Sequence, residues 1–243
     1  MRFSTCVASV AIMLSSSFAL ADEAAPAAKP TLVRGTVELF DGKVLVIKTM
    51  AGAVVSLPVT PSTHFAIVLK KNFSQLKPTD YIGVTAVPDK DGHLRAEEIH
   101  TLPLHGMNEG QYPWDHHPST VTAPTAASSM TNGTVMRIRP ASAGSMTNGT
   151  IASAGASQLI VTYHGAAMMD GKCEGLVVPG HATCTGTAVI DVPPDTPVQA
   201  IVPSFHPDVK PGLAVVAAVA TDAAGRQVLT SATLENNGVK PEF

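Results

Sequence analysis

The stretch GTVELFDGKVLVIKT at residues 35–49 decides the fold, because GTIASAGASQLIVTY at residues 149–163 repeats its pattern of strand, turn and strand. From glycine to leucine the two stretches align at a constant offset of 114 positions. Further along the chain, LKP at residues 76–78 matches VKP at residues 209–211 at an offset of 133. The chain is therefore predicted to contain two copies of one unit.

The growth of the offset from 114 to 133 places 19 additional residues in the second copy, between positions 163 and 189. Cys173 and Cys184 both lie inside this insertion. In an exported chain a disulfide between them is the default expectation, and it would staple a protruding loop at residues 166–185. The alternative is a metal site from Cys173, His181 and Cys184, although that spacing matches no standard zinc pattern.

Composition favours an all-β chain with many turns. Charged residues make up 14% of the sequence, well below the average of roughly 25% in soluble domains, while Gly and Pro number 19 each. Each copy contains short apolar runs separated by turn signals such as Asp41-Gly42, with one helical turn near residues 72–77. About five short strands with one helical turn is typical of a small OB-type barrel. We therefore predict two tandem small OB-like β-barrels, at residues 31–103 and 146–236.

The motifs of the first copy resemble a known family. In order they are G-x-V, D-G-x-x-x-V, a Pro-Ser-Thr turn, L-K-P-x-D and D-G-x-x-x-A-x-x-I. This order resembles a bacterial exported OB-like small β-barrel domain family of unknown function, over residues 33–101 and, with a divergent second copy, over residues 149–235. The second copy departs where Leu213 and Ala224 replace the aspartates of the motifs. The resemblance implies a fold and export, and it implies no activity.

Residues 104–145 are predicted to link the barrels, and residues 120–145 are rich in Ser, Thr, Ala and Pro, as flexible connectors are. The second barrel has two candidate first strands, since TNGTV at residues 131–135 is nearly duplicated by TNGTI at residues 147–151. The later stretch is preferred because its spacing to Leu159 matches the first copy. The earlier stretch would then add an edge strand. A short tail, residues 237–243, completes the chain.

The amino terminus has the pattern of a secretory signal. Arg2 precedes an apolar stretch, and Ala19-Leu20-Ala21 is a small-x-small cleavage site, so the mature chain would begin at Asp22 after a leader of residues 1–21. Residues 22–30 would form a flexible start. The apolar run at residues 213–220 is far too short to cross a bilayer, so no transmembrane segment is expected in the mature chain. The predicted location is the periplasm or the exterior.

Enzymatic and nucleic-acid functions find no support in the motifs or the charge. The sequence has no nucleophile elbow, Walker loop, dinucleotide fingerprint or zinc-protease motif, so we expect no enzyme. A formal charge of −3 and an aromatic content of 5% offer neither the cationic groove nor the stacking platforms that single-stranded nucleic acids need.

One His/Met-rich segment, residues 100–117, stands out. Imidazole suits Cu(II) and Zn, and thioether suits Cu(I), so this segment is the candidate for binding or buffering a transition metal such as copper or zinc. The candidate ligands are His100, His105, Met107, His116 and His117. The alternative interpretation is that this segment is an ordered linker that binds no metal.

Two further functions stay open. The chain could be an envelope binding module that takes a protein or glycan partner through its barrel face and loops, because OB-type barrels bind extended ligands there. It could also be a structural spacer without any metal.

Overall fold

The computed structural model describes residues 31–88, 93–114, 128–140, 157–205, 208–222 and 224–241. Strands fill most of these ranges, which contain one 3₁₀ turn (η1, Phe73–Gln75) and no α-helix. The prediction of an all-β chain is confirmed. No helix in those ranges has the length and apolar character needed to cross a membrane. The predicted leader and residues 22–30 lie outside the described residues.

The strands have the following bounds in chain order: β1 Thr31–Phe40, β2 Val44–Thr49, β3 Val54–Pro58, β4 His64–Lys71, β5 Tyr81–Pro88, β6 Leu94–Thr101, β7 Gly110–Trp114, β8 Ser128–Arg139, β9 Ser157–Gly165, β10 Ala167–Met169, β11 Lys172–Leu176, β12 Cys184–Val192, β13 Val198–Pro203, β14 Ala214–Thr221 and β15 Gln227–Leu234.

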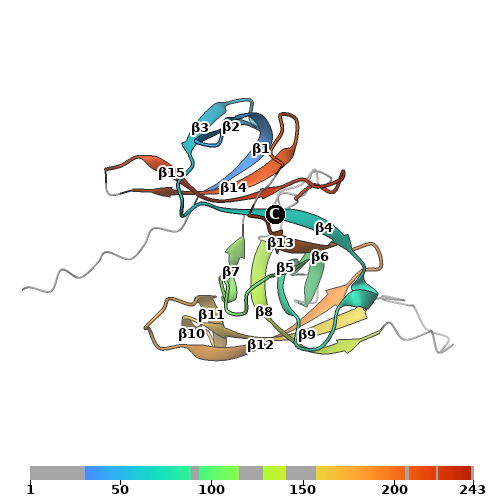
Figure 1. Cartoon of the computed structure of the whole chain (residues 1–243). Coiled ribbons are helices and arrows are strands. Elements are labelled where there is room, and N and C mark those ends of the chain that lie inside the picture. Colours follow the sequence, from blue (N-terminus) through green and yellow to red (C-terminus); the bar gives the residue numbers. More distant parts are fainter. Residues whose placement is uncertain are drawn as a thin grey trace, which may run out of the picture.

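These strands form two units, one above the other in Figure 1, with β4 and β13 between them. In the upper or first unit, neighbouring strands pair in the order β3, β2, β1, β14 and β15. In the lower or second unit, the pairing runs β8, β9, β12, β6 and β5 and returns to β8, so five strands close a ring. In both units, side-chain alternation along the strands directs one apolar row inward.

Each unit has its own apolar core. In the first unit, Leu45 and Ile47 of β2 are fully buried, while their neighbours Val44 and Val46 are half-buried on the outer face. In the second unit, β12 repeats the pattern, since Ile190 and its inward neighbours pack in the core and the intervening residues face outward. Burial of each such aliphatic side chain stabilises the fold by about 1.5–3 kcal/mol.

The two units exchange strands between the copies. The first unit combines β1–β3 of the first copy with the hairpin β14–β15 of the second copy, and the second unit combines β8, β9 and β12 with the hairpin β5–β6 of the first copy. The prediction of consecutive units at residues 31–103 and 146–236 is therefore wrong. A sequence repeat shows which strands are alike, but either hairpin offers the same edge and the same buried row to either unit.

The β-bulges identify which strands of the two units correspond. The β1–β2 ladder has a bulge between Val37 and Leu39, and the β8–β9 ladder has one between Val135 and Arg137. The hairpins β5–β6 and β14–β15 are also bulged, at positions that differ by the repeat offset of 133. Because bulges are specific local features, their agreement identifies β8 as the counterpart of β1.

This correspondence corrects the register predicted for the second copy. TNGTV at residues 131–135 lies in β8, which pairs with β5 on one edge and with β7 and β9 on the other. It is an interior strand, and the predicted linker at residues 104–145 contains two strands of the sheet. The preferred first strand at residues 146–152 lies outside the described residues. The spacing argument failed because the connection after β8 is longer than the connection after β1.

A glycine marks the same crossing in both units. A Cβ atom on Gly35 would lie 2.1 Å from the carbonyl oxygen of Lys48, and one on Gly133 would lie 2.5 Å from the carbonyl oxygen of Thr162. Lys48 and Thr162 differ by the repeat offset of 114. Only a residue without a side chain lets the two backbones approach this closely.

The insertion forms a hairpin, β10–β11, and its second strand pairs with β7. The predicted disulfide is present and joins Cys173 of β11 to Cys184, the first residue of β12. Together β7, β11 and β10 make a three-stranded extension of the second unit, which we call the extension.

The strand exchange predicts that the two copies hold together without a covalent connection. We expect a chain of residues 22–243 with a protease site inserted at residues 115–127 to stay one particle in gel filtration after complete cleavage, because each unit needs strands from both fragments. Cleaved protein in urea should separate into two fragments. Two separate folded species in native buffer would contradict the exchange.

The glycine crossing predicts a difference between two alanine variants. Gly133→Ala should lower the free energy of unfolding by about 2 kcal/mol, since its Cβ overpacks the crossing. Gly149→Ala is the matched control, because the alternative register would place that glycine at the crossing. Denaturant unfolding measures both, and a larger loss for Gly149→Ala would overturn the assignment of β8.

Candidate functional site

The described members of the predicted metal set have different surroundings. His100 lies on β6 and is 2% exposed, with its Nε2 atom 2.7 Å from Oε1 of Glu98. His105 is exposed in the connection after β6, where its ring packs on the ring of Tyr81 with the two centroids 5.2 Å apart. The carbonyl oxygen of Met107 accepts a hydrogen bond from the Tyr81 hydroxyl at 3.1 Å. The Met107 backbone therefore contributes to holding this connection over β5.

His116 and His117 lie outside the described residues. Among the residues that are described, no group of three or more His, Cys, Asp or Glu side chains is placed to hold a metal ion. The alternative set of Cys173, His181 and Cys184 is excluded as a thiolate site because the two sulfur atoms are bonded to each other.

The Glu98–His100 pair is a buried contact between a carboxyl group and an imidazole that only one unit contains. Both residues are at most 2% exposed. At the repeat offset of 133, the other unit has Ser231 and Thr233 at the corresponding positions, both half-buried. The fold therefore tolerates small neutral side chains at these positions. A buried charge pair is seldom a net source of stability, although removing one partner alone is costly.

A groove of about 850 Å³ lies in the second unit. One side is the extension, which contributes Tyr112 of β7 and Lys172 of β11. The other side is the outward row of β12, including Val189 and Asp191, together with the end of β5 and the start of β6 at Pro88 and Leu94. None of the described residues that line this groove belongs to the first unit. The groove therefore accompanies the insertion, which the first copy lacks.

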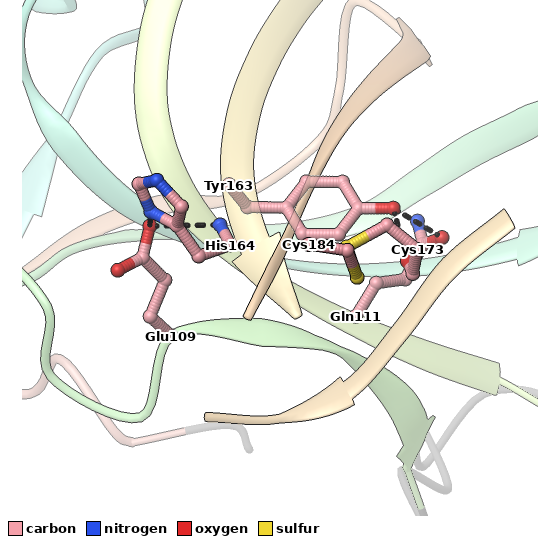
Figure 2. Close-up of a disulfide and its surroundings, with 6 residues drawn as sticks. All are labelled: Glu109, Gln111, Tyr163, His164, Cys173 and Cys184. Carbon is pink, nitrogen blue, oxygen red and sulfur yellow. Dashed lines mark hydrogen bonds and ion pairs between the residues drawn. A yellow bond between two sulfur atoms is a disulfide. The ribbon is translucent and has the colours of Figure 1, made fainter. Parts of the chain in front are cut away.

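Tyr163 joins the walls of the groove at its inner end. Its hydroxyl donates to the carbonyl oxygen of Cys173 at 2.8 Å and lies 3.0 Å from Oε1 of Gln111 (Figure 2). A Cβ atom on Gly186 would lie 2.4 Å from the Tyr163 ring, so the glycine makes room for this side chain. Burial raises the pKa of Tyr163, and the hydroxyl keeps its proton. One side chain thus contacts β7, β11 and β12.

Tyr112 presents an aromatic surface to the groove. Nδ2 of Asn132 donates to its hydroxyl oxygen at 2.9 Å, and its ring packs edge-to-face on Trp114 with the centroids 6.2 Å apart. Burial raises the pKa of Tyr112 to about 12. The ring is therefore neutral at physiological pH and held in one orientation, as a ligand-binding aromatic side chain should be.

A second polar contact fastens the extension to β9. Oε1 of Glu109 accepts hydrogen bonds from the backbone N–H of His164 at 3.0 Å and pairs with its Nδ1 atom at 2.9 Å (Figure 2). The Glu109 carbonyl also accepts from the backbone N–H of Val177, which follows β11. Glu109 thereby ties the start of β7 to β9 and to the end of β11.

Sequence reasoning missed Tyr163, Tyr112 and Gln111 as groove residues, because they come from two strands, β7 and β9, that lie far apart in the sequence. The one sequence signal that bears on them is the insertion, which marks where the second copy has more than the fold requires. Comparisons with family models, with curated proteins and with solved structures find no match to this chain.

The comparison of the two units predicts the energetics of the buried pair. His100→Thr should cost about 3 kcal/mol of unfolding free energy, because it leaves the Glu98 carboxylate buried without the imidazole. Adding Glu98→Ser, which makes both positions match the other unit, should recover most of that loss. Urea unfolding of the two variants and the wild type measures this recovery. A double variant less stable than His100→Thr would show that the two side chains do not act as a pair.

Proposed function

We propose that this chain is an exported, non-catalytic binding protein whose second-unit groove takes an oligosaccharide. The observation that carries the proposal is the groove itself, which exists where the insertion has been added to the repeated unit. Export is supported by the secretory pattern of residues 1–21.

The position of the groove supports a ligand-binding role. In an OB-type barrel, the face of the second and third strands and the adjoining loops bind oligonucleotides and oligosaccharides. We infer that the second unit is OB-like, because β12 and β6 pair in parallel within the ring while its other ladders are antiparallel. On that reading β9 and β12 are the second and third strands, and both contribute to the groove. The sequence resemblance to an exported OB-like family points the same way.

The chemistry of the lining favours a glycan over a nucleic acid. Tyr112 offers an aromatic face, and Gln111 and Gln158 offer amides that can donate to and accept from hydroxyl groups. The described lining contains a single Lys or Arg residue, Lys172, and also the carboxylates of Glu174 and Asp191. A phosphate backbone needs a cationic groove, whereas a neutral sugar chain does not.

Metal binding by residues 100–117 is a second proposal, supported by residue type. Imidazole and thioether groups are suitable ligands for copper in an exported protein. Native mass spectrometry of untagged protein purified without chelators tests it directly. A metal mass that disappears when His105, His116 and His117 are replaced would support this function.

The oligosaccharide proposal predicts that a protein of residues 22–243 binds sugars on a glycan array. The fluorescence of Trp114 reports the binding of these sugars in solution. This residue is the single tryptophan of the chain and packs on Tyr112, so ligand binding should change its fluorescence. Tyr112→Ala should weaken binding by about tenfold, the equivalent of 1.4 kcal/mol. Phe205→Ala is the control, since Phe205 is 91% exposed and does not line the groove. An array without signal would contradict the proposal.

A further inference from the structure

The disulfide stands where the walls of the groove meet. Cys173 lies on β11, within the extension, and Cys184 begins β12, which forms the opposite wall. The ladders of β11 in the described residues run to β10 and to β7, where two residue pairs form. None of them runs to β12. The sulfur–sulfur bond is thus the direct covalent connection between two strands that share no hydrogen-bonded ladder.

The disulfide is also packed into the groove's supporting structure. Cys173 is buried and lines the groove between Lys172 and Glu174. A Cβ atom on Gly165 would lie 2.7 Å from Sγ of Cys173, so β9 approaches the sulfur closely. Figure 2 shows the disulfide beside the Tyr163 side chain, whose hydroxyl donates to the Cys173 carbonyl oxygen. Three strands, β9, β11 and β12, therefore converge on one bond.

We propose that the Cys173–Cys184 disulfide is the positioning element of the groove, so that ligand affinity depends on its oxidation state. This inference rests on the proposed binding function. With the bond intact, the β11 wall stays at a set distance from β12, and the lining residues of both walls reach one ligand. With the bond reduced, β11 and the residue after it are held by the short ladder with β7, by the Tyr163 hydroxyl, and by the backbone hydrogen bonds from Ala166 to Gly175 and from Val177 to Glu109.

The reduction is an ordinary thiol–disulfide exchange with a dithiol. A thiolate of the dithiol attacks one cysteine sulfur, the sulfur–sulfur bond breaks, and the other cysteine leaves as a thiolate that takes up a proton. The second thiol of the dithiol then attacks the mixed disulfide. The protein gains two electrons and two protons as two thiols, and the reagent departs as its own disulfide.

The first arm of the test uses hydrogen exchange on the mature chain, residues 22–243, oxidised and after treatment with dithiothreitol and alkylation. Amide exchange at residues 166–177 should accelerate at least about tenfold on reduction, because a wall held by few hydrogen bonds opens more often. The first unit contains no cysteine and supplies the internal control, so its protection should not change. Unchanged exchange at residues 166–177 would overturn the proposal.

The second arm measures the affinity for the same immobilised glycans of three proteins: the oxidised form, the reduced form and the variant Cys173→Ser/Cys184→Ser. We expect the reduced form and the double variant to bind at least about tenfold more weakly than the oxidised form. Tyr163→Phe, which keeps the ring and loses the hydroxyl, should weaken binding less in the oxidised state than in the reduced state. Equal affinity of the oxidised and reduced forms would also overturn the proposal.

The two arms separate this inference from the function on which it rests. If reduction loosens residues 166–177 while the oxidised protein binds no glycan, the oligosaccharide function fails and the disulfide stands as the element that positions the wall. If the oxidised protein binds glycans and reduction changes neither exchange nor affinity, the function stands and the positioning role fails.

Discussion

The antiparallel pairing of β4 with β13 is the contact on which the rest of the molecule depends. Its register places Val68 opposite Ile201, two residues that occupy the same position in the two copies, and Val68 is fully buried. A twofold pseudo-axis therefore passes through this pair. Each of the two strands also pairs in parallel with a strand of the exchanged hairpins, β15 with β4 and β6 with β13. One ladder thus carries the chain from unit to unit in both directions and joins the two halves into one sheet.

The repeat gives the protein an internal standard against which its special features can be recognised. Glycine crossings, bulges and apolar rows occur in both units, so they belong to the fold. Among the described residues, the insertion, its disulfide and the groove occur in the second unit, and the buried Glu98–His100 pair of that unit has neutral counterparts in the first unit. Features that occur in one unit alone are not required by the fold that the two units share. That contrast is a physical reason to look for function in the second unit, and it does not depend on any resemblance to another protein.

Local patterns in the sequence were sufficient for some of these features and insufficient for others. Alternation and turn residues predicted an all-β chain, and the change of offset located the insertion whose disulfide the structure contains. These patterns could not predict which strands pair. Because β14 and β5 are equivalent strands of the two copies, β1 and β8 could each pair with either of them. The burial of His100 was not predictable for a related reason. Its place on β6 turns it toward Glu98 in a buried layer, and a list of residue types cannot show that burial.

The exchange of hairpins also governs when the chain can fold as it is made. Thr31 of β1 pairs with Val219 of β14, so the first strand of the chain waits for one of the last. A growing polypeptide that has emerged only as far as the first copy has β1, β2 and β3 without the hairpin that completes their core. Contacts this distant in sequence form slowly because a long loop must close first. The sheet of the first unit can therefore be completed only after β14 and β15 have been synthesised, near the end of the chain.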